Sequence, residues 1–279
     1  MEADKKRQSE QDLEEEQKKE LEKGYETNAS LFIKLGIIVL SIIMIIGFGV
    51  KIAPNAVTIS TIGRKIDLPI YSVNTEERKV ALSFDVSGDN KDTDKILAIL
   101  SKHKVKTTFF ITGKWVEEYP KEVKAIAAAG HDIGNHSENH MQMSQLSVEE
   151  CNEEIMTLHD KVKEVAGINM NLFRAPYGEY NNTLVAAARD CGYYTIQWDV
   201  DSMDWKDYGV NSILSKTLDN RKLGNGSILL LHISAKYTAE ALEEIIIGLQ
   251  EKGYEIVPVS QLIYTGEYKV DQMGRQIEK

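Results

Sequence analysis

Residues 134–140 read Gly-Asn-His-Ser-Glu-Asn-His, a polar segment with two histidines. His136 and His140 are four residues apart, so both imidazoles would fall on one face if the segment turned helical, and both could then reach one metal ion. Ser137 follows the first histidine, and Glu138 stands one place too late for the His-Glu-x-x-His signature of metalloproteases. The alternative to a metal site is a pair of solvated histidines in a polar turn.

Short apolar runs alternate with amphipathic helical patterns on both sides of this stretch. Strands that alternate with helices imply a parallel sheet, and a single unit of this length favours a closed barrel over two open domains. We therefore predict an α/β barrel over residues 79–265. The expected strands are 80–86, 107–112, 172–175, 195–200, 227–233 and 254–259, and the expected helices are 92–103, 120–129, 148–166, 182–191, 210–218 and 239–252.

Polar residues that can carry chemistry follow the predicted strands. In a parallel α/β barrel the active site lies at the carboxyl ends of the strands, so side chains from several strands meet there. Polar residues with only structural roles would be distributed along the strands and would not gather at one end of successive strands. The residues at these ends are Asp85, His136, His140, Arg174, Asp201, Asp204 and His232.

Each of these residues has an ordinary structural explanation beside a functional one. Asp85 could cap a turn, or it could be an ionised carboxylate that Arg174 stabilises through a charge-assisted pair. Arg174 itself could be a surface residue of a Pro-Gly turn. His232 ends a nearly wholly apolar run, where a buried histidine is common, but Asp201 and Asp204 offer carboxylates that could raise its pKa and make it a general acid.

Five segments together resemble the successive motifs of the polysaccharide deacetylases, carbohydrate esterase family four, which is also called the NodB-homology domain. They are SFDV (83–86), HSENH (136–140), RAPYG (174–178), DVDSMDW (199–205) and LLHI (230–233), in this order. The resemblance implies a distorted (β/α) barrel of seven or eight units. It also implies a hydrolase that removes N-acetyl groups from the amino sugars of a polysaccharide, with a divalent metal, Zn²⁺ or Co²⁺, and a metal-bound water as nucleophile.

The resemblance assigns catalytic roles to four positions. Asp85 corresponds to the catalytic base, and Arg174 to the arginine that steadies it. His232 corresponds to the general acid, and Asp204 to the carboxylate that tunes this histidine.

The remaining motif positions concern the metal and the substrate. His136 and His140 correspond to metal ligands, and the backbone N–H of Tyr177 is placed to bind the oxyanion of the tetrahedral intermediate. Trp205 and Tyr177 are candidates for the walls of the sugar pocket, or for packing.

One position departs from the family pattern. The family usually has a second aspartate, a metal ligand, directly after the base, and here this residue is Val86. Valine cannot ligate a metal, so the site either binds metal through two histidines and waters or recruits a carboxylate from the following loop. Asp89 and Asp92 are the candidates, although Asp92 also suits the N-cap of the next helix. Some sporulation-type relatives share a non-aspartate at this position.

The N-terminal third of the chain has a different character. Residues 31–50 read LFIKLGIIVLSIIMIIGFGV, long and apolar enough to cross a bilayer. We expect an uncleaved single-pass anchor, with a cleaved signal peptide as the alternative. Lysines are slightly more numerous before this segment, which favours a cytoplasmic N-terminus and a catalytic domain outside the cell membrane. The expected organisation is a charged cytoplasmic tail (1–30), the transmembrane helix (31–50), a stalk (51–78), the catalytic domain (79–265) and a C-terminal tail (266–279).

Composition excludes several classes of protein. The net charge of -10 argues against a nucleic-acid surface. Two cysteines, Cys151 and Cys191, are too few for a disulfide framework, so we expect unpaired thiols.

The sequence thus predicts a membrane-anchored, metal-dependent deacetylase of cell-wall glycan, with N-acetylglucosamine or N-acetylmuramic acid residues of peptidoglycan as substrate. A second hypothesis is a weak or inactive homologue that binds glycan at the membrane, which Val86 favours. A third is an amidase that acts on a non-sugar acyl amide. No protein partner is indicated.

Overall fold

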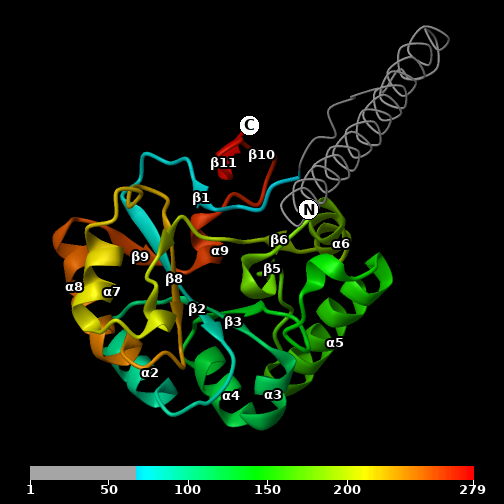
Figure 1. Ribbon diagram of the computed structural model, residues 1–279, viewed down its shortest axis with the longest axis horizontal. Coiled ribbons are helices and arrows are strands. Elements are labelled where there is room, and N and C mark those ends of the chain that lie inside the picture. The colour runs from blue at the N-terminus through cyan, green and yellow to red at the C-terminus, as the bar shows by residue number, and fades with distance from the viewer. Residues whose placement is uncertain (1–66) are drawn as a thin grey trace, which may run out of the picture. The chain divides into compact units, whose positions relative to one another are not determined.

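The computed structural model describes residues 67–279 (Figure 1). The predicted cytoplasmic tail, the transmembrane segment 31–50 and most of the predicted stalk lie outside these residues. Within residues 67–279, no helix combines the length and the apolar character that a membrane crossing requires.

The centre of the fold is a curled parallel sheet around β2 (Lys79–Val86). Its strand order is β6-β5-β4-β3-β2-β8-β7, and β9 also pairs with β2. This architecture confirms the predicted parallel α/β sheet with helices, but among the strands described here the sheet curls into part of a barrel and does not close. The other strands are β3 (Thr108–Ile111), β4 (Asp132–Asn135), β5 (Leu172–Phe173), β6 (Tyr194–Thr195), β7 (Val200–Asp201), β8 (Ile228–His232) and β9 (Glu255–Val257).

Helices cover the outside of this sheet (Figure 1). The helix α5, which covers 148–166 as predicted, begins with a capping box between Ser147 and Glu150 and ends at Gly167 in the left-handed conformation. The short helices α3 and α9 were not predicted. The helices are α2 (Thr93–Lys102), α3 (Gly113–Glu118), α4 (Pro120–Ala128), α5 (Val148–Ala166), α6 (Asn182–Asp190), α7 (Val210–Leu218), α8 (Thr238–Glu251) and α9 (Val259–Leu262).

Strand β2 shows how the sheet separates core from site. Alternate side chains of a strand point to opposite faces. Phe84 and Val86 join the core cluster that also contains residues of α2 and α8, whereas Ala81 belongs to a second cluster on the other face. Ser83 and Asp85 share the face of Ala81 by this alternation. Asp85 therefore faces the interior of the curled sheet, and Val86 faces the helices.

The predicted strand 195–200 is wrong as a single element. In the structure it is two short strands, β6 and β7, which lie at opposite ends of the strand order. Between them, the Ile196 N–H donates to the Phe173 carbonyl of β5 and the Asp199 N–H donates to the Ile228 carbonyl of β8, so this segment passes from one end of the strand order to the other. Among the strands described here, β6 and β7 do not pair, so the curled sheet has an open seam between them.

A second, three-stranded sheet joins the two ends of the described chain. It has the order β1-β11-β10, with β1 (Ser72–Val73), β10 (Tyr268–Val270) and β11 (Arg275–Glu278). Figure 1 shows β1 beside β11 although about two hundred residues separate them. Parts of the segments that the sequence assigned to a stalk and a C-terminal tail are therefore paired strands.

Candidate active site

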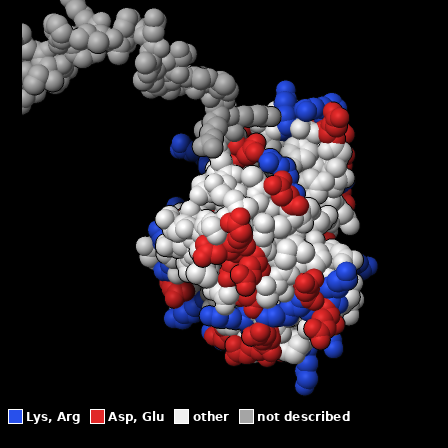
Figure 2. Space-filling view, turned by 90° about the vertical axis from the view of Figure 1, so that its right-hand side faces the viewer, with Lys and Arg blue, Asp and Glu red and all other residues white. Residues whose placement is uncertain are grey.

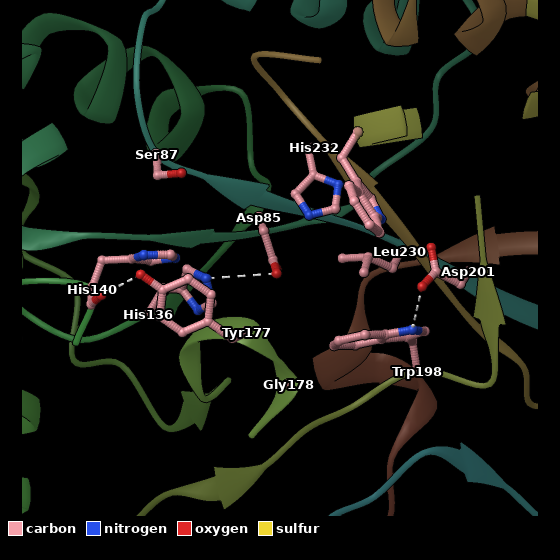
Figure 3. Close-up of a pocket in the computed structure, with 11 residues that line it drawn as sticks. Asp85, Ser87, His136, His140, Tyr177, Gly178, Trp198, Asp201, Leu230 and His232 are labelled. Atoms are coloured by element: carbon pink, nitrogen blue, oxygen red, sulfur yellow. Dashed lines mark hydrogen bonds and ion pairs between the residues drawn. The ribbon is translucent and has the colours of Figure 1, made fainter. Parts of the chain in front are cut away.

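A pocket of about 390 Å³ opens at the carboxyl ends of the strands (Figure 3). Its position agrees with the rule that parallel α/β sheets place their sites at this edge. The structure brings Asp85, both histidines of the 134–140 stretch and His232 together here, as the sequence predicted. The lining residues are Asp85, Ser87, His136, His140, Tyr177, Gly178, Trp198, Asp201, Trp205, Leu230 and His232.

Asp85 forms a buried ion pair with Arg174 beneath the pocket. The Arg174 Nη1 donates to Asp85 Oδ1 at 2.8 Å, and Nη2 donates to the Ser83 hydroxyl at 2.9 Å. The guanidinium is fully buried and lies over the Phe110 ring, 4.1 Å from its centroid. Gly134 permits this packing, because a Cβ at that position would meet the same ring at 2.5 Å.

This environment keeps Asp85 ionised. Burial alone would raise the pKa of Asp85, but the neighbouring positive charges lower it, and the Arg174 guanidinium is charged at every relevant pH. Asp85 can therefore accept a proton from a reacting group in the pocket.

The two histidines of the 134–140 stretch meet without a helix. Ser137 and His140 have positive φ values of 66° and 55°, so the segment is not the helical turn that would put both imidazoles on one face, yet the two imidazole centroids lie 5.0 Å apart. Asn135 shapes this turn by accepting a hydrogen bond from the Ser137 N–H and donating to the Ile155 carbonyl of α5.

Hydrogen bonding fixes the tautomer of His136. Its Nδ1 lies 2.8 Å from the Arg174 carbonyl, which can only accept, so Nδ1 carries the proton and Nε2 is free. That Nε2 lies 3.6 Å from Asp85 Oδ2. Burial lowers the pKa of His136, and burial also lowers that of His140, to about 4. Both imidazoles are therefore neutral at neutral pH, the form that binds metal.

His232 stands across the pocket, paired with a buried carboxylate. Its Nδ1 donates to Asp204 Oδ1 at 2.7 Å, so Nε2 is left for a ligand. Asp204 Oδ2 accepts from the His232 backbone N–H and from the Thr238 hydroxyl. Burial alone would lower the pKa of His232, but the hydrogen bond and charge of Asp204 outweigh it, and the net shift is upward. The ring is thus suited to donate a proton.

Aromatic side chains form the rim of the pocket. Tyr177 and Trp205 are 61% and 56% exposed, which supports a role as walls rather than as packing. Tyr177 has φ 61°, and its hydroxyl donates to the His140 carbonyl at 3.2 Å, which joins the two loops. Trp198 lines the same pocket, and its Nε1 donates to Asp201 (Figure 3).

The donor set fits a divalent ion only in part. His136 and His140 supply two neutral imidazoles, but Val86 is fully buried and faces the helices. Asp89 pairs with Lys91 at 3.7 Å, and Asp92 occupies the N-cap of α2, so neither lines the pocket. Among residues 67–279, no group of three His, Cys, Asp or Glu side chains is arranged to hold a metal.

Sequence reasoning missed three supporting residues. Ser83, two places before Asp85 on the same face of β2, contacts Arg174, and the period of a strand could have indicated it. Thr238 at the start of α8 holds Asp204, and Trp198 lines the pocket. Both stand near predicted site residues, Trp198 directly before the segment 199–205 and Thr238 six residues after His232, but neither residue type indicates chemistry by itself.

The sequence of this chain is similar to those of known proteins. A family model described as polysaccharide deacetylase matches residues 72–196. The chain is 34% identical to the uncharacterized protein YlxY of Bacillus subtilis, over 70% of this chain and 60% of that protein. It is 31% identical to the peptidoglycan-N-acetylmuramic acid deacetylase PdaA of the same organism, over 73% of this chain and 78% of that protein.

Solved structures show the same likeness. Wild-type BA3943 from Bacillus anthracis, described as a CE4 family pseudoenzyme, is 34% identical with a TM-score of 0.66, over 70% of this chain and 68% of that one. A mutant of BA3943 with restored enzymatic activity matches with the same identity and TM-score, over 70% of each chain.

Proposed function

We infer the function of this chain from the premise that it belongs to the polysaccharide deacetylase family. We propose that it is a hydrolase that removes N-acetyl groups from the amino sugars of peptidoglycan, at N-acetylmuramic acid or N-acetylglucosamine. The observation that carries this proposal is that a carboxylate and an imidazole with shifted pKa values, Asp85 and His232, face each other across one pocket. Asp85 is held ionised by Arg174, and His232 has a raised pKa beside Asp204.

Asp85 acts as the general base. Water attacks the acetyl carbonyl carbon, and the carboxylate takes one proton from that water as the new C–O bond forms. Arg174 holds Asp85 Oδ1, which leaves Oδ2 on the pocket side, where it lies near His136 Nε2. The hydrogen bond from Ser83 to the Leu229 carbonyl fixes the hydroxyl that in turn orients Arg174.

His232 acts as the general acid. When the C–N bond breaks, its Nε2 gives a proton to the departing amine, which would otherwise be a very poor leaving group. The products are acetate and a free amino sugar. Asp204 accepts from the Nδ1 of this ring throughout, so the imidazolium is oriented and its charge is balanced.

The rim residues bind and orient the substrate. The Tyr177 N–H is the donor for the developing oxyanion, an interaction typically worth about 2.7–4 kcal/mol of activation barrier. The rings of Tyr177 and Trp205 are exposed at the rim, where they can cover a sugar face and exclude water from the reacting bond.

A divalent ion, Zn²⁺ or Co²⁺, is proposed as the cofactor, held by His136 and His140. When bound, such an ion polarises the carbonyl and lowers the pKa of water to about 7. The support for this assignment is the neutral state of both imidazoles and the free Nε2 of His136. Two side-chain ligands bind more weakly than three, so we expect a metal that chelators remove readily.

The proposed setting is the cell membrane. Residues 31–50 would anchor the chain by one helix, with the N-terminus in the cytoplasm and the catalytic domain outside, where the cell-wall glycan lies. The length and apolar composition of this segment support the anchor, and the lysine distribution supports the orientation.

A second candidate function is a membrane-tethered glycan-binding module without turnover. Two observations favour it: Val86 replaces the usual metal ligand and is packed in the core, and BA3943, a similar chain, is described as a pseudoenzyme. The intact pairs Asp85–Arg174 and His232–Asp204 favour the enzyme, because a binding module needs neither a base nor an acid.

The deciding experiment measures metal content and acetate release on the same purified full chain, in detergent, with peptidoglycan as substrate and with or without added Zn²⁺ or Co²⁺. We expect acetate release that depends on metal and falls by about 10²–10⁴-fold in Asp85→Asn. His136→Ala should lose both metal and activity. The matched control is Asp89→Asn, which should retain activity because Asp89 lies outside the pocket. Glycan binding without acetate release under any metal condition would establish the binding module instead.

A further inference from the structure

A second groove, of about 660 Å³, continues from the active-site pocket along the open seam of the sheet. The two cavities share the wall formed by Tyr177, Gly178, Trp198 and Asp201, of which Figure 3 shows the active-site side. From there the groove runs between the turn that precedes β8 and the small sheet of β1 and β11. The residues that line only this groove are Tyr71, Ser72, Gln197, Asp199, Arg221, Lys222, Met273 and Arg275.

The two carboxylates of the groove have partners within the fold. Asp199 accepts from the Ser227 hydroxyl and the Ile228 N–H, and Asp201 accepts from the Trp198 indole and the Met203 N–H. These hydrogen bonds fix the segment that crosses the seam. Both acids therefore help to fix the groove wall, and the charge of Lys222 also acts on Asp199, where it lowers the pKa against the effect of burial.

The three cations of the groove, unlike its two carboxylates, have no ion-pair partner among the described residues. Arg221, Lys222 and Arg275 are exposed, and none forms an ion pair with any carboxylate of residues 67–279. They come from two separate elements: Arg221 and Lys222 from the turn before β8, and Arg275 from β11, where it pairs with Ser72 of β1. Three guanidinium or ammonium groups thus line one groove with their donors available.

We propose that this groove binds carboxylate groups of the glycan strand on the sugars that flank the reacting one, through Arg221, Lys222 and Arg275. The inference rests on the proposed function, because it takes the neighbouring pocket as the site where the N-acetyl sugar reacts. The chemistry that the groove recognises is a carboxylate on a glycan. In peptidoglycan this carboxylate is either the lactyl group of a muramic acid or the acid of a stem peptide.

The groove suits a sugar chain better than a free anion. Tyr71 and Met273, which is 76% exposed, add apolar surface between the cations, and sugar rings pack on such surface while their charged substituents reach the guanidinium groups. Continuity with the active-site pocket means that one strand can occupy both cavities. A neutral glycan would leave all three cations unused.

Negative charge on another face of the molecule disfavours binding of an anionic glycan there. Acidic side chains gather in a band on the face shown in Figure 2, the side of the molecule where α5 lies. The exposed residues of α5 include Glu149, Glu150, Glu153 and Glu164. An anionic glycan is repelled from this face, so the groove is its favoured path across the protein.

The test compares one groove variant with one control of equal charge change. The groove variant is Arg221→Gln/Lys222→Gln/Arg275→Gln, and the control is Lys121→Gln/Lys124→Gln/Lys163→Gln, whose lysines are exposed on α4 and α5. Both are made in the full chain, in detergent, with Asp85→Asn added so that substrate is not consumed. Circular dichroism and thermal unfolding confirm that each variant folds.

Binding is measured by calorimetry with three tetrasaccharides of alternating N-acetylglucosamine and N-acetylmuramic acid. The first carries free lactyl carboxylates, the second has these carboxylates converted to amides, and the third carries stem peptides with free acids. We expect the parent chain to bind an acidic tetrasaccharide at least about tenfold more tightly than the amidated one, with a preference that shrinks as salt is raised. The groove variant should lose this preference, and the control should keep it.

Each outcome decides the inference. Preference for the first ligand assigns the groove to the lactyl carboxylate, and preference for the third assigns it to the peptide. Equal binding of all three ligands, or an unchanged preference in the groove variant, would overturn the inference and leave the proposed function intact. Failure to bind any of the three would overturn the proposed function as well, because the active-site pocket would then have no affinity for the glycan.

Discussion

Val86 keeps its side chain away from the pocket because β2 remains a regular strand up to this residue. It pairs with Ile111 of β3, its carbonyl accepts from the Thr112 N–H, and its side chain is fully buried in the core. The missing metal ligand is therefore a difference in the direction of a side chain as well as in its chemistry. The loop that follows β2 does not place Asp89 or Asp92 in the pocket.

Val86→Asp should make the stability of the protein depend on metal. Without metal, a carboxylate at this buried position costs more than the about 1–3 kcal/mol of an unsatisfied neutral group, so the midpoint of thermal unfolding should fall. With Zn²⁺, the end of β2 can turn the carboxylate toward His136 and His140, and the midpoint should rise by more than it does in the parent chain.

The control for this substitution is Val86→Asn, which has nearly the same shape and no charge. It should be destabilised by about 1–3 kcal/mol, less than the carboxylate, and gain less from Zn²⁺. An equal response of the two variants to the metal would show that residue 86 does not reach the site.

His232 and Asp204 form the second hydrogen-bonded pair of charged groups in the active site. The pKa of His232 is raised in the folded protein above its value of about 6.5 in the unfolded chain. The imidazole therefore binds a proton more tightly in the folded state than in the unfolded state. The stabilisation from this protonation is complete below that value and is lost as pH rises through the folded-state pKa.

Asp204→Asn should lower the pKa of His232, because burial, which lowers it, remains while the charge of Asp204 is removed. The upper limb of the pH profile of acetate release should move to lower pH, and an NMR titration of the His232 ring should show the same shift. Asp219→Asn, an exposed aspartate at the end of α7, is the matched control and should leave both curves in place.

At the scale of elements, length and periodicity decided what could be predicted. The long helix 148–166 and the strand at 79–86 follow patterns that extend over several turns or residues, and their predictions are confirmed. Strands of two residues, such as β1, β6 and β7, have no periodicity to detect. Their existence depends on partners far along the chain, so the open seam and the small sheet could not be foreseen.

Some site residues could be predicted from a local pattern, and others depend on contacts between distant segments. Asp85 and His232 end apolar strands, where a polar residue is conspicuous, and both line the pocket. The turn after β4 contains two residues with positive φ, and neither is a glycine that would have signalled a non-helical backbone. Gly134 and Arg174 meet through the Phe110 ring, a contact between three strands that no local pattern contains.

Gln276→Ala tests whether the end of the chain is part of the fold. Gln276 is fully buried in β11, and its side chain donates to the Tyr264 carbonyl and accepts from the Tyr264 N–H. Removal of this amide leaves both backbone groups without a partner, so the free energy of unfolding should fall by about 1–3 kcal/mol in urea denaturation. Gln261→Ala, at an exposed position of α9, should change it little. A free tail would give two equal curves.

For the molecule as a whole, the proposed orientation in the membrane would decide which substrate the chain can meet. If residues 31–50 span the membrane with the N-terminus inside, protease added to protoplasts should digest the folded domain and spare a tag placed at residue 1. The measurement is immunoblotting with antibodies to the tag and to the domain, with a cytoplasmic protein as the control for lysis. Digestion of the domain only after lysis would reverse the proposed topology.

The open seam between β6 and β7 has a consequence for how a long polymer is handled. The neighbouring groove is lined by the exposed side chains of Arg221, Lys222, Met273 and Arg275, so it lies at the surface and can receive a strand laterally, at any sugar along its length, whereas a closed tunnel admits a strand only by its end. The protein would then act at internal positions of an intact, cross-linked meshwork without waiting for a chain terminus to be cut free. Its modification sites should accordingly be scattered along each strand rather than accumulate from one end.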